Sequence, residues 1–220
     1  MGSGKSTVAT FLRELGAEVI EADELGRKLM EPGQAVYAEI VRVFGPEVVR
    51  ADGLLNRSRL AELAFQGGRL NELNAIVHPA AIAAQRVWME EVFSRDPAAV
   101  AVVESALIFE VERDARVRGE QESVLSDWQR RFDRVVVVIA PDEQKIVRYA
   151  ARISPDESGR EAAERDARRR LAHQISDAEK AARADYVLEN TGDREFLRGQ
   201  VVELWNRLVA ESNKIPGIES

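Results

Sequence analysis

Four short runs of apolar, largely β-branched residues limit the folds open to this 220-residue chain. They cover residues 18–21, 99–104, 135–140 and 186–189. Short continuous apolar runs are typical of strands buried on both faces of a parallel sheet. The first three runs are each followed by sequence with helical periodicity, as the crossovers of such a sheet require. The pattern predicts an α/β fold built on a parallel sheet.

The helical patterns divide the chain into a predicted core and an insertion. They cover residues 7–15, 60–65, 70–76, 81–93, 143–152 and 195–210. Residues 25–95 contain no convincing strand, which indicates a mostly helical insertion of the kind that often carries an acceptor site. We therefore expect a core of residues 1–24 and 96–220, with a helical subdomain at 25–95 and a lid at about 153–172.

Composition excludes several classes of protein. Acidic residues outnumber basic ones, 38 to 31, so the formal net charge is −7, which argues against nucleic-acid and anionic-membrane binding. With no cysteine and two histidines, disulfide scaffolds, thiol nucleophiles and histidine metal clusters are disfavoured. The apolar runs are far too short to span a membrane, and no secretory segment is present. We expect a soluble cytoplasmic protein, either a monomer or a weak homo-oligomer.

The first residues of the chain carry the second half of a phosphate-binding loop, G-K-[ST], as Gly4-Lys5-Ser6. Gly2 and Gly4 allow backbone amides to turn inward around phosphate oxygens. Lys5 is placed to reach the β- and γ-phosphates, and the Ser6 hydroxyl to bind Mg²⁺. A helix over residues 7–15 would direct its positive end at the same phosphates.

Two other interpretations of this motif stay open. A lone G-K-[ST] also arises by chance, and Met-Gly-x-x-x-Ser fits an N-myristoylation signal. The first glycine of the full motif, and the strand that precedes it in P-loop proteins, would fall before Met1. Because losing a central strand costs stability comparable to that of a whole domain, we expect the natural protein to begin about ten residues earlier.

Asp23 and Glu104 fall at the ends of predicted strands, where open α/β sheets bind ligands. Asp23 follows the first apolar run and either orients an acceptor hydroxyl or caps a helix that starts at Glu24. Glu104 ends the second run and either holds Mg²⁺ through water or is a plain acidic residue at a strand end. His78 precedes Pro79, which favours a structural turn that begins the next helix.

The segment 154–170 is densely charged, with three consecutive arginines at its end. These arginines could clamp a transferring phosphate in a closing lid. A solvated helix explains the same residues through pairs four residues apart: Glu161–Arg165, Glu164–Arg168 and Asp166–Arg170. Further along, residues 190–192 (Asn-Thr-Gly) form a turn by composition and could also contact a nucleotide base.

Seven motifs occur in order along nearly the whole chain. They are GSGKST (2–7), VIEADELGRKLMEPG (19–33), DGLLNRSRLAELAF (52–65), IVHP (76–79), VVESALIFE (102–110), RRLAHQ (169–174) and ADYVLENTG (184–192). With this specific combination the chain resembles the dephospho-coenzyme A kinase family. The resemblance implies a P-loop kinase core with a parallel sheet, a helical acceptor-binding insertion and a lid. It also implies Mg²⁺-dependent transfer of the γ-phosphate of ATP to the 3′-hydroxyl of dephospho-coenzyme A.

The resemblance assigns roles to individual residues. The ATP phosphates would be bound by Gly2, Ser3, Gly4, Lys5, Ser6 and Thr7. Asp23 matches the second acid of the family's Asp-Ala-Asp motif, which favours a base or hydroxyl-orienting role over helix capping. Arg57 and His78 look like acceptor-domain residues. Arg148 and Arg170 look like phosphate-contacting arginines near the lid, and Asn190 like an adenine contact.

The chain also departs from the family pattern. Glu21 replaces the first acid of the Asp-Ala-Asp motif, and Asn56 stands where an aspartate is usual. Residues 111–134 make a segment about twice the usual length, rich in both charge signs, which we expect to be a surface excursion. Two other functions stay open: a P-loop kinase for another small acceptor, such as a nucleoside monophosphate, and an inactive nucleotide-binding module.

Overall fold

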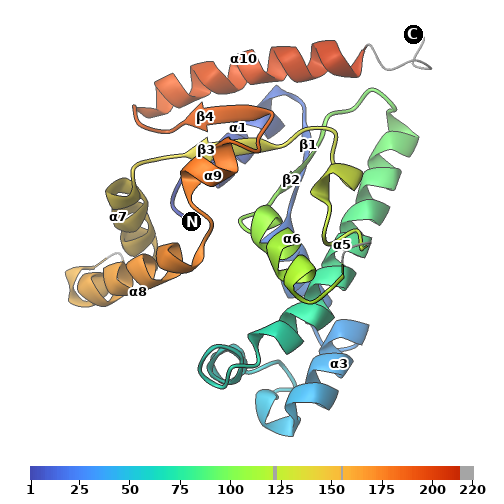
Figure 1. Cartoon of the computed structure of the whole chain (residues 1–220), viewed down its shortest axis with the longest axis vertical. Coiled ribbons are helices and arrows are strands. Elements are labelled where there is room, and N and C mark those ends of the chain that lie inside the picture. Colours follow the sequence, from blue (N-terminus) through green and yellow to red (C-terminus); the bar gives the residue numbers. More distant parts are fainter. Residues whose placement is uncertain (121–122, 155, 214–220) are drawn as a thin grey trace. The chain divides into compact units, whose positions relative to one another are not determined.

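The computed structural model describes residues 1–120, 123–154 and 156–213, apart from the side chains of Gln66 and Glu157. The chain divides into two compact units (Figure 1). The first unit comprises Met1–Val19 and Asp96–Ser220, and the second Ile20–Arg95.

The first unit is built from short strands and the helices that connect them. In chain order its elements are α1 (Lys5–Leu15), the start of β1 (Glu18–Glu21), β2 (Ala101–Glu104), α6 (Ile108–Val117), η3 (Trp128–Arg130), β3 (Val136–Ile139), α7 (Asp142–Ile153), η4 (Glu157–Gly159), α8 (Arg160–His173), α9 (Asp177–Ala181), β4 (Tyr186–Glu189) and α10 (Arg194–Ser212). All four predicted strands are present, which confirms the α/β class.

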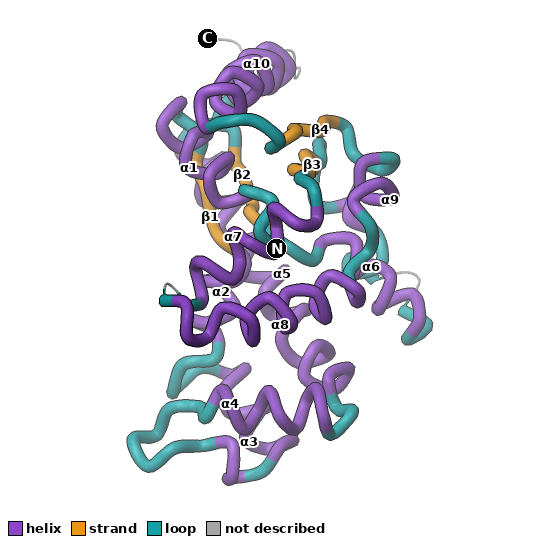
Figure 2. Tube along the Cα trace, turned by 90° about the vertical axis from the view of Figure 1, so that its left-hand side faces the viewer, coloured by secondary structure: helices purple, strands orange, loops and turns teal. Residues whose placement is uncertain are grey.

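Strands β3 and β4 run parallel, side by side (Figure 2), in a register that pairs Val136 with Tyr186 and Ile139 with Glu189. Strand β2 pairs with the start of β1, where the backbone N–H of Glu18 donates to the Val100 carbonyl at 3.0 Å. The carboxyl ends of β3 and β4 therefore lie at one edge, where the chain leads into α7 and into Asn190.

The apolar core of this unit lies between α1, the strands and α10. Val8, Phe11 and Leu12 of α1 are almost completely buried, because apolar residues three and four apart share one face of a helix. They pack with Val138 and Leu188 of the sheet, and α10 runs beside β4 and α1 (Figure 1). Burial of such a face stabilises the helix that carries the phosphate loop.

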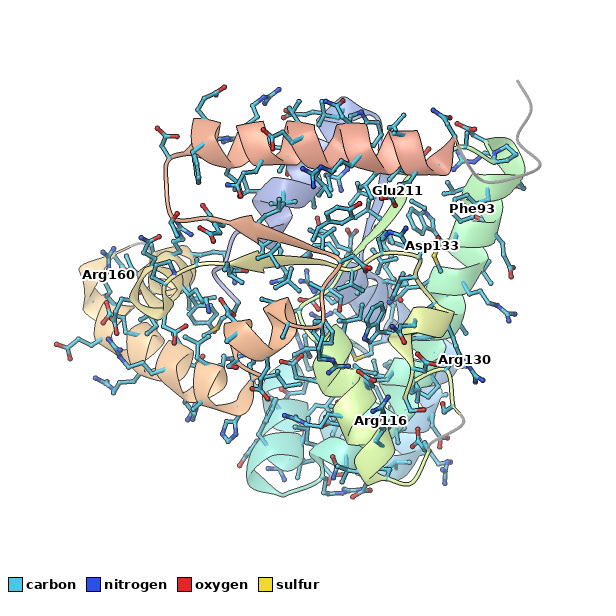
Figure 3. The ribbon with its side chains drawn as sticks, turned by 45° about the horizontal axis from the view of Figure 1, so that its top comes forward. Phe93, Arg116, Arg130, Asp133, Arg160 and Glu211 are labelled. Carbon is cyan, nitrogen blue, oxygen red and sulfur yellow. The ribbon has the colours of Figure 1, made fainter. Side chains whose placement is uncertain are left out.

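The end of α10 is tied to the start of the β3–β4 sheet by one carboxylate. Glu211, labelled in Figure 3, pairs with Arg134 at 2.8 Å and accepts a hydrogen bond from the Tyr186 hydroxyl at 2.5 Å. This contact fixes the last helix across both strands at the end opposite to the phosphate loop.

The second unit is helical apart from its first residues. It contains the end of β1, then α2 (Ala22–Leu29), α3 (Ala35–Phe44), η1 (Pro46–Val48), α4 (Arg57–Ala61), η2 (Glu62–Gln66) and α5 (Leu70–Arg95). Its core is a cluster around Ile40, Phe44 and Val48. Asn56 caps α4, since its side-chain oxygen accepts from the Arg59 backbone N–H at 3.1 Å, a role that asparagine and aspartate share.

The predicted turn at His78-Pro79 is wrong. Both residues lie inside the 26-residue helix α5, which joins the two separate helices expected at 70–76 and 81–93. Proline removes one helical N–H and crowds the carbonyl four residues earlier. Leu73, Ile76 and Val77 nevertheless pack against the apolar cluster of this unit, and that packing favours a continuous helix.

The expected surface excursion at 111–134 is also wrong for the residues that the structure describes. Ala115, Leu125 and Trp128 are buried, and Trp128 packs edge-on against Phe109 with ring centroids 6.1 Å apart. The segment therefore contributes to a small apolar cluster under β3. None of the described helices is both long and apolar enough to cross a membrane.

Candidate active site

The phosphate loop precedes α1 and is shaped by two glycines. Gly2 has φ +68° and Gly4 φ +99°, a left-handed conformation that costs other residues about 1–2 kcal/mol. The Gly4 carbonyl accepts hydrogen bonds from the backbone N–H groups of Thr7 and Val8, both at 3.0 Å, where the helix begins. Helix α1 thus starts at Lys5, two residues earlier than predicted, and directs its N-terminal amides at the loop.

Close contacts on both sides hold this loop in place. A β-carbon at Gly2 would lie 2.9 Å from the Lys145 Cα, and closer still to the Lys145 carbonyl oxygen. A β-carbon at Gly4 would collide with the Asn190 carboxamide. The loop is therefore packed between the backbone of α7 and the residue that follows β4, and only glycine fits at either position.

Asn190 supports the loop through its side chain. It is 9 % exposed, and its Nδ2 donates to the Ser3 carbonyl at 2.8 Å. Its backbone N–H donates to the Ile139 carbonyl at the end of β3, and the Arg148 guanidinium donates to its carbonyl at 3.3 and 3.4 Å. Two predicted ATP-binding residues are thus brought together with the loop, while a direct contact of Asn190 with adenine stays a prediction.

Lys5, Ser6 and Glu104 supply the charged and polar groups beside the loop. The Lys5 Nζ lies 3.9 Å from a carboxylate oxygen of Glu104, and their side chains are 23 % and 14 % exposed. Ser6 is exposed on the first turn of α1. A lysine that keeps a loose carboxylate neighbour and partial exposure can still turn toward a phosphate.

The donor set suits Mg²⁺ in the way that kinases bind it. Across the part of the chain that the structure describes, no group of three or more His, Cys, Asp or Glu side chains could hold a metal. Mg²⁺ commonly keeps several waters and takes one or two protein oxygens together with substrate phosphates. The hydroxyl of Ser6 and the carboxylate of Glu104 fit that pattern.

Helices α7 and α8 pack against each other and carry the predicted phosphate-contacting arginines (Figure 1). Arg170 of α8 is exposed and pairs with Asp166 at 2.6 Å, and the Tyr149 hydroxyl of α7 donates to the same carboxylate at 2.9 Å. Burial, reinforced by that hydrogen bond, raises the pKa of Tyr149. Burial alone would raise the pKa of Asp166, but hydrogen bonds from Arg169, Arg170 and Tyr149 lower it on balance.

Two of the predicted i,i+4 ion pairs form on α8: Glu161 with Arg165 at 3.5 Å and Asp166 with Arg170 at 2.6 Å. Arg168 instead makes a two-pronged contact with Glu143 of α7, at 2.7 and 3.0 Å. That hydrogen bond raises the pKa of Arg168 and lowers the pKa of Glu143. The charges of α8 therefore serve its packing on α7 as well as its solvation.

The second unit carries the predicted acceptor-side residues. Asp23 is exposed in the first turn of α2, which begins at Ala22; the N-cap is Glu21, so the capping role weighed for Asp23 is wrong. Arg57 is exposed at the start of α4. His78 is partly buried within α5.

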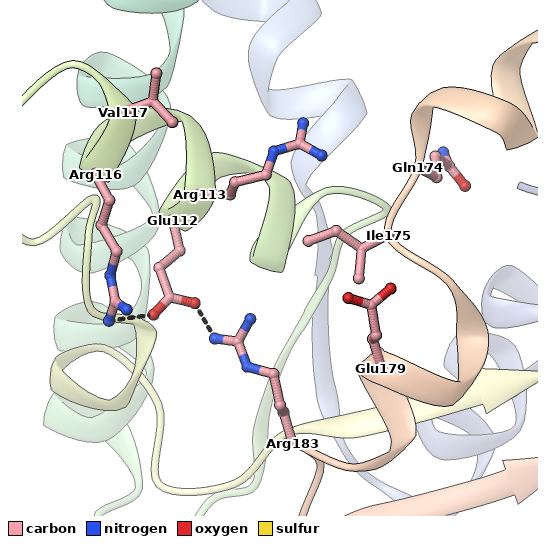
Figure 4. Close-up of a pocket in the computed structure, with 8 residues that line it drawn as sticks. All are labelled: Glu112, Arg113, Arg116, Val117, Gln174, Ile175, Glu179 and Arg183. Atoms are coloured by element: carbon pink, nitrogen blue, oxygen red, sulfur yellow. Dashed lines mark hydrogen bonds and ion pairs between the residues drawn. The ribbon is translucent and has the colours of Figure 1, made fainter.

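A cavity of about 630 Å³ lies elsewhere in the first unit, between α6 and the segment around α9 (Figure 4). Arg116 and Arg183 approach Glu112 from either side; the Arg116 contact measures 2.6 Å, and Glu112 itself is buried. Glu179 accepts from the Ser176 hydroxyl at 2.8 Å. None of the residues that line the cavity is a predicted site residue. Arg116 and Arg183 are both paired with Glu112.

Sequence reasoning missed one residue next to the loop, Lys145. It lies on the same face of α7 as the buried Ile146 and Tyr149, and is itself 3 % exposed. A lysine within an otherwise apolar helical stripe was the available signal, because lysine is almost never fully buried without a partner.

Replacing Gly4 with alanine should weaken nucleotide binding at least tenfold. The new side chain would be strained at φ +99° and would displace the Asn190 carboxamide from the Ser3 carbonyl. Titration with a fluorescent ATP analogue measures the loss. Gly119→Ala is the matched control, since Gly119 has φ +81° but nothing within 4 Å of its β-carbon position. Equal affinities in the two variants would contradict the packing argument.

Known proteins resemble this chain over most of its length. The family model described as dephospho-CoA kinase matches residues 1–195. The dephospho-CoA kinase of Symbiobacterium thermophilum is 39% identical over 209 residues, which are 93% of this chain and 77% of that protein.

Two solved structures are similar over nearly the whole chain. The Thermus thermophilus protein TT1252 is 34% identical with a TM-score of 0.69, covering 94% of this chain and 93% of that one. Dephospho-CoA kinase from Campylobacter jejuni is similar in fold, with a TM-score of 0.62 at 23% identity and coverage of 94% and 92%. The predicted P-loop kinase fold is thereby confirmed. The chain belongs to the dephospho-CoA kinase family.

Proposed function

We propose that this chain transfers the γ-phosphoryl group of ATP to the 3′-hydroxyl of dephospho-coenzyme A, giving coenzyme A and ADP. The observation that carries the proposal is the phosphate loop at the N-terminus of α1, held between α7 and Asn190, in a chain of this family. Backbone amides and a helix N-terminus provide the positive end that phosphates require.

The first unit binds and polarises the nucleotide in this proposal. Backbone amides of residues 2–7 hold the β- and γ-phosphates, and Lys5 turns from Glu104 toward the oxygen atoms on which charge develops. Arg148 and Arg170 contact the phosphates from α7 and α8. Phosphoryl transfer needs mainly positioning and charge stabilisation, which these groups supply.

The Ser6 hydroxyl would hold Mg²⁺ directly, and Glu104 would hold it through water. A bound ion would supply positive charge that neutralises the phosphate oxygens during transfer. Ser6 stands on the first turn of α1, directly after Lys5, so one helix start presents both the cation and the hydroxyl.

The second unit supplies the acceptor side. Asp23 accepts the proton of the 3′-hydroxyl as its oxygen bonds to the γ-phosphorus, and the bond from that phosphorus to the β–γ bridging oxygen breaks. ADP leaves with the electron pair of that bond. Arg57 and His78 bind the acceptor; a cytoplasmic location and a monomeric or weakly oligomeric state stay predictions from the sequence.

An acceptor comparison tests the proposal. ADP release is measured with ATP, Mg²⁺ and one of three acceptors: dephospho-coenzyme A, adenosine or a nucleoside monophosphate. We expect release with dephospho-coenzyme A, and a product whose added phosphate is removed by a 3′-nucleotidase. Faster turnover with the nucleoside monophosphate would replace this substrate assignment, and release with none of the three would overturn the kinase proposal.

A further inference from the structure

A buried lysine lies directly beneath the phosphate loop. Lys145 is 3 % exposed, and its backbone is in close contact with Gly2, where a β-carbon would lie 2.9 Å from both the Cα and the carbonyl carbon of Lys145. The position of this stretch of α7 therefore sets the position of the start of the loop. A shift of α7 toward Gly2 must move the loop amides, and a shift away from Gly2 removes the support of the loop on that side.

The side chain of Lys145 fixes that stretch of α7. Its Nζ contacts Asp177 at 2.6 Å and Asp142 at 2.9 Å. Asp177 is the first residue of α9, and its other contact is the Ala140 backbone N–H, 3.4 Å away, just after β3. One carboxylate thus joins α7, α9 and the end of β3 through a buried ammonium group.

The two carboxylates differ in how firmly they can hold the lysine. The Asp142 side chain is 72% exposed, so water competes for its contact, whereas the Asp177 side chain is 31% exposed. Contacts between exposed charges contribute little, while a buried charge that loses its partner is costly. We therefore expect Asp177, rather than Asp142, to be the main partner that holds the Lys145 ammonium group.

The same helix, α9, carries a second buried ion pair. Lys180 pairs with Glu110 at 2.7 Å, and the two side chains are 13% and 7% exposed. If Lys145 served only to stabilise the fold, its removal should resemble the removal of Lys180. Lys145 differs from Lys180 in that its backbone lies against Gly2 of the phosphate loop.

We propose that Lys145 is a positioning residue for the phosphate loop: through Asp177 it holds α7 against Gly2 and thereby sets the affinity for the nucleotide phosphates. The proposal extends the function proposed above. It places Lys145 behind the loop backbone, so that the lysine acts through α7 rather than by touching ATP.

Lys145→Met, which keeps the length of the side chain but removes its charge, tests this role. We expect the dissociation constant for ATP to rise about tenfold, equivalent to 1.4 kcal/mol. The KM for dephospho-coenzyme A and kcat at saturating ATP should stay within about twofold, as expected when binding common to ground and transition states is lost. ATP binding is measured by titration, and turnover by ADP release.

Lys180→Met is the matched control and should lower the melting temperature while leaving the ATP dissociation constant within about twofold of the original. Asp177→Asn, which keeps Lys145 and the side-chain volume, should reproduce the weaker ATP binding even if Lys145→Met does not fold. Asp142→Asn should change little. A melting temperature lowered in Lys145→Met or Asp177→Asn with unchanged ATP affinity would overturn the proposal.

The two readouts keep this proposal separate from the function on which it rests. If the unsubstituted chain binds ATP but phosphorylates no dephospho-coenzyme A, the proposed function fails, and the titrations still decide the role of Lys145. If the chain is active and Lys145→Met binds ATP as well as Lys180→Met does, the positioning role alone fails.

Discussion

Replacing Lys5 with methionine is expected to reduce kcat for phosphoryl transfer by about 10²–10³-fold. One preorganised donor aimed at developing charge lowers the barrier by about 2.7–4 kcal/mol in a site that excludes water. Lys5 is the first residue of α1 and has Glu104 as a neighbour 3.9 Å away. Methionine keeps the aliphatic stem, so packing on the helix should persist.

Steady-state ADP release with dephospho-coenzyme A measures this effect, with circular dichroism to verify the fold. Lys180→Met, which removes a lysine held by Glu110, is the control and should keep kcat within about twofold. A Lys5→Met enzyme that retains kcat within threefold of the original, about 0.7 kcal/mol, would show that Lys5 does not stabilise the transferring phosphate.

Replacing Asp23 with asparagine is expected to lower kcat by about 10²–10⁴-fold, the usual contribution of a positioned general base. Asparagine is nearly isosteric and leaves the first turn of α2 intact, but it cannot take the proton of the acceptor hydroxyl. Because the proposed role of Asp23 concerns the acceptor hydroxyl, the ATP dissociation constant should stay within about twofold of the original.

Glu24→Gln provides the comparison for Asp23, because Glu24 is the next residue of α2 and pairs with Lys28 at 3.2 Å on an exposed surface. It should retain kcat within about twofold. Single-turnover measurements would separate the chemical step from product release. If Asp23→Asn lowers the affinity for dephospho-coenzyme A and leaves the single-turnover rate unchanged, Asp23 binds the acceptor and a different group takes the proton.

Local patterns were sufficient to predict the strands and several helices. β1 and β4 occur at the predicted residues, and α1 ends at Leu15 as predicted, because a run of β-branched residues or a C-terminal glycine acts within a few residues. The turn predicted at Pro79 is wrong because a rule about neighbouring residues does not include packing between distant ones. Apolar residues on either side of the proline pack against the cluster around Ile40 and Phe44, and this packing favours a continuous helix.

The missed parts of the site depend on contacts between residues far apart in the sequence. Glu110 and Glu112 look like solvated acids, yet both are buried by pairing with Lys180 and Arg183, about 70 residues later. Lys145 and Asp177 likewise form an ion pair although they are far apart in the sequence. Charge patterns reveal i,i+4 neighbours on one helix, whereas such pairs become visible only when the chain has folded.

The packing of α8 on α7 has a thermodynamic consequence. Ala167 of α8 is buried in an apolar cluster with Ile146 and Tyr149 of α7, and Leu171 of α8 packs against that cluster. If α8 moves as the predicted lid by separating from α7, these apolar side chains enter water. Heat capacity rises with the apolar area that is exposed, so such a movement should carry a positive heat-capacity change, and its equilibrium should follow a curved van't Hoff plot.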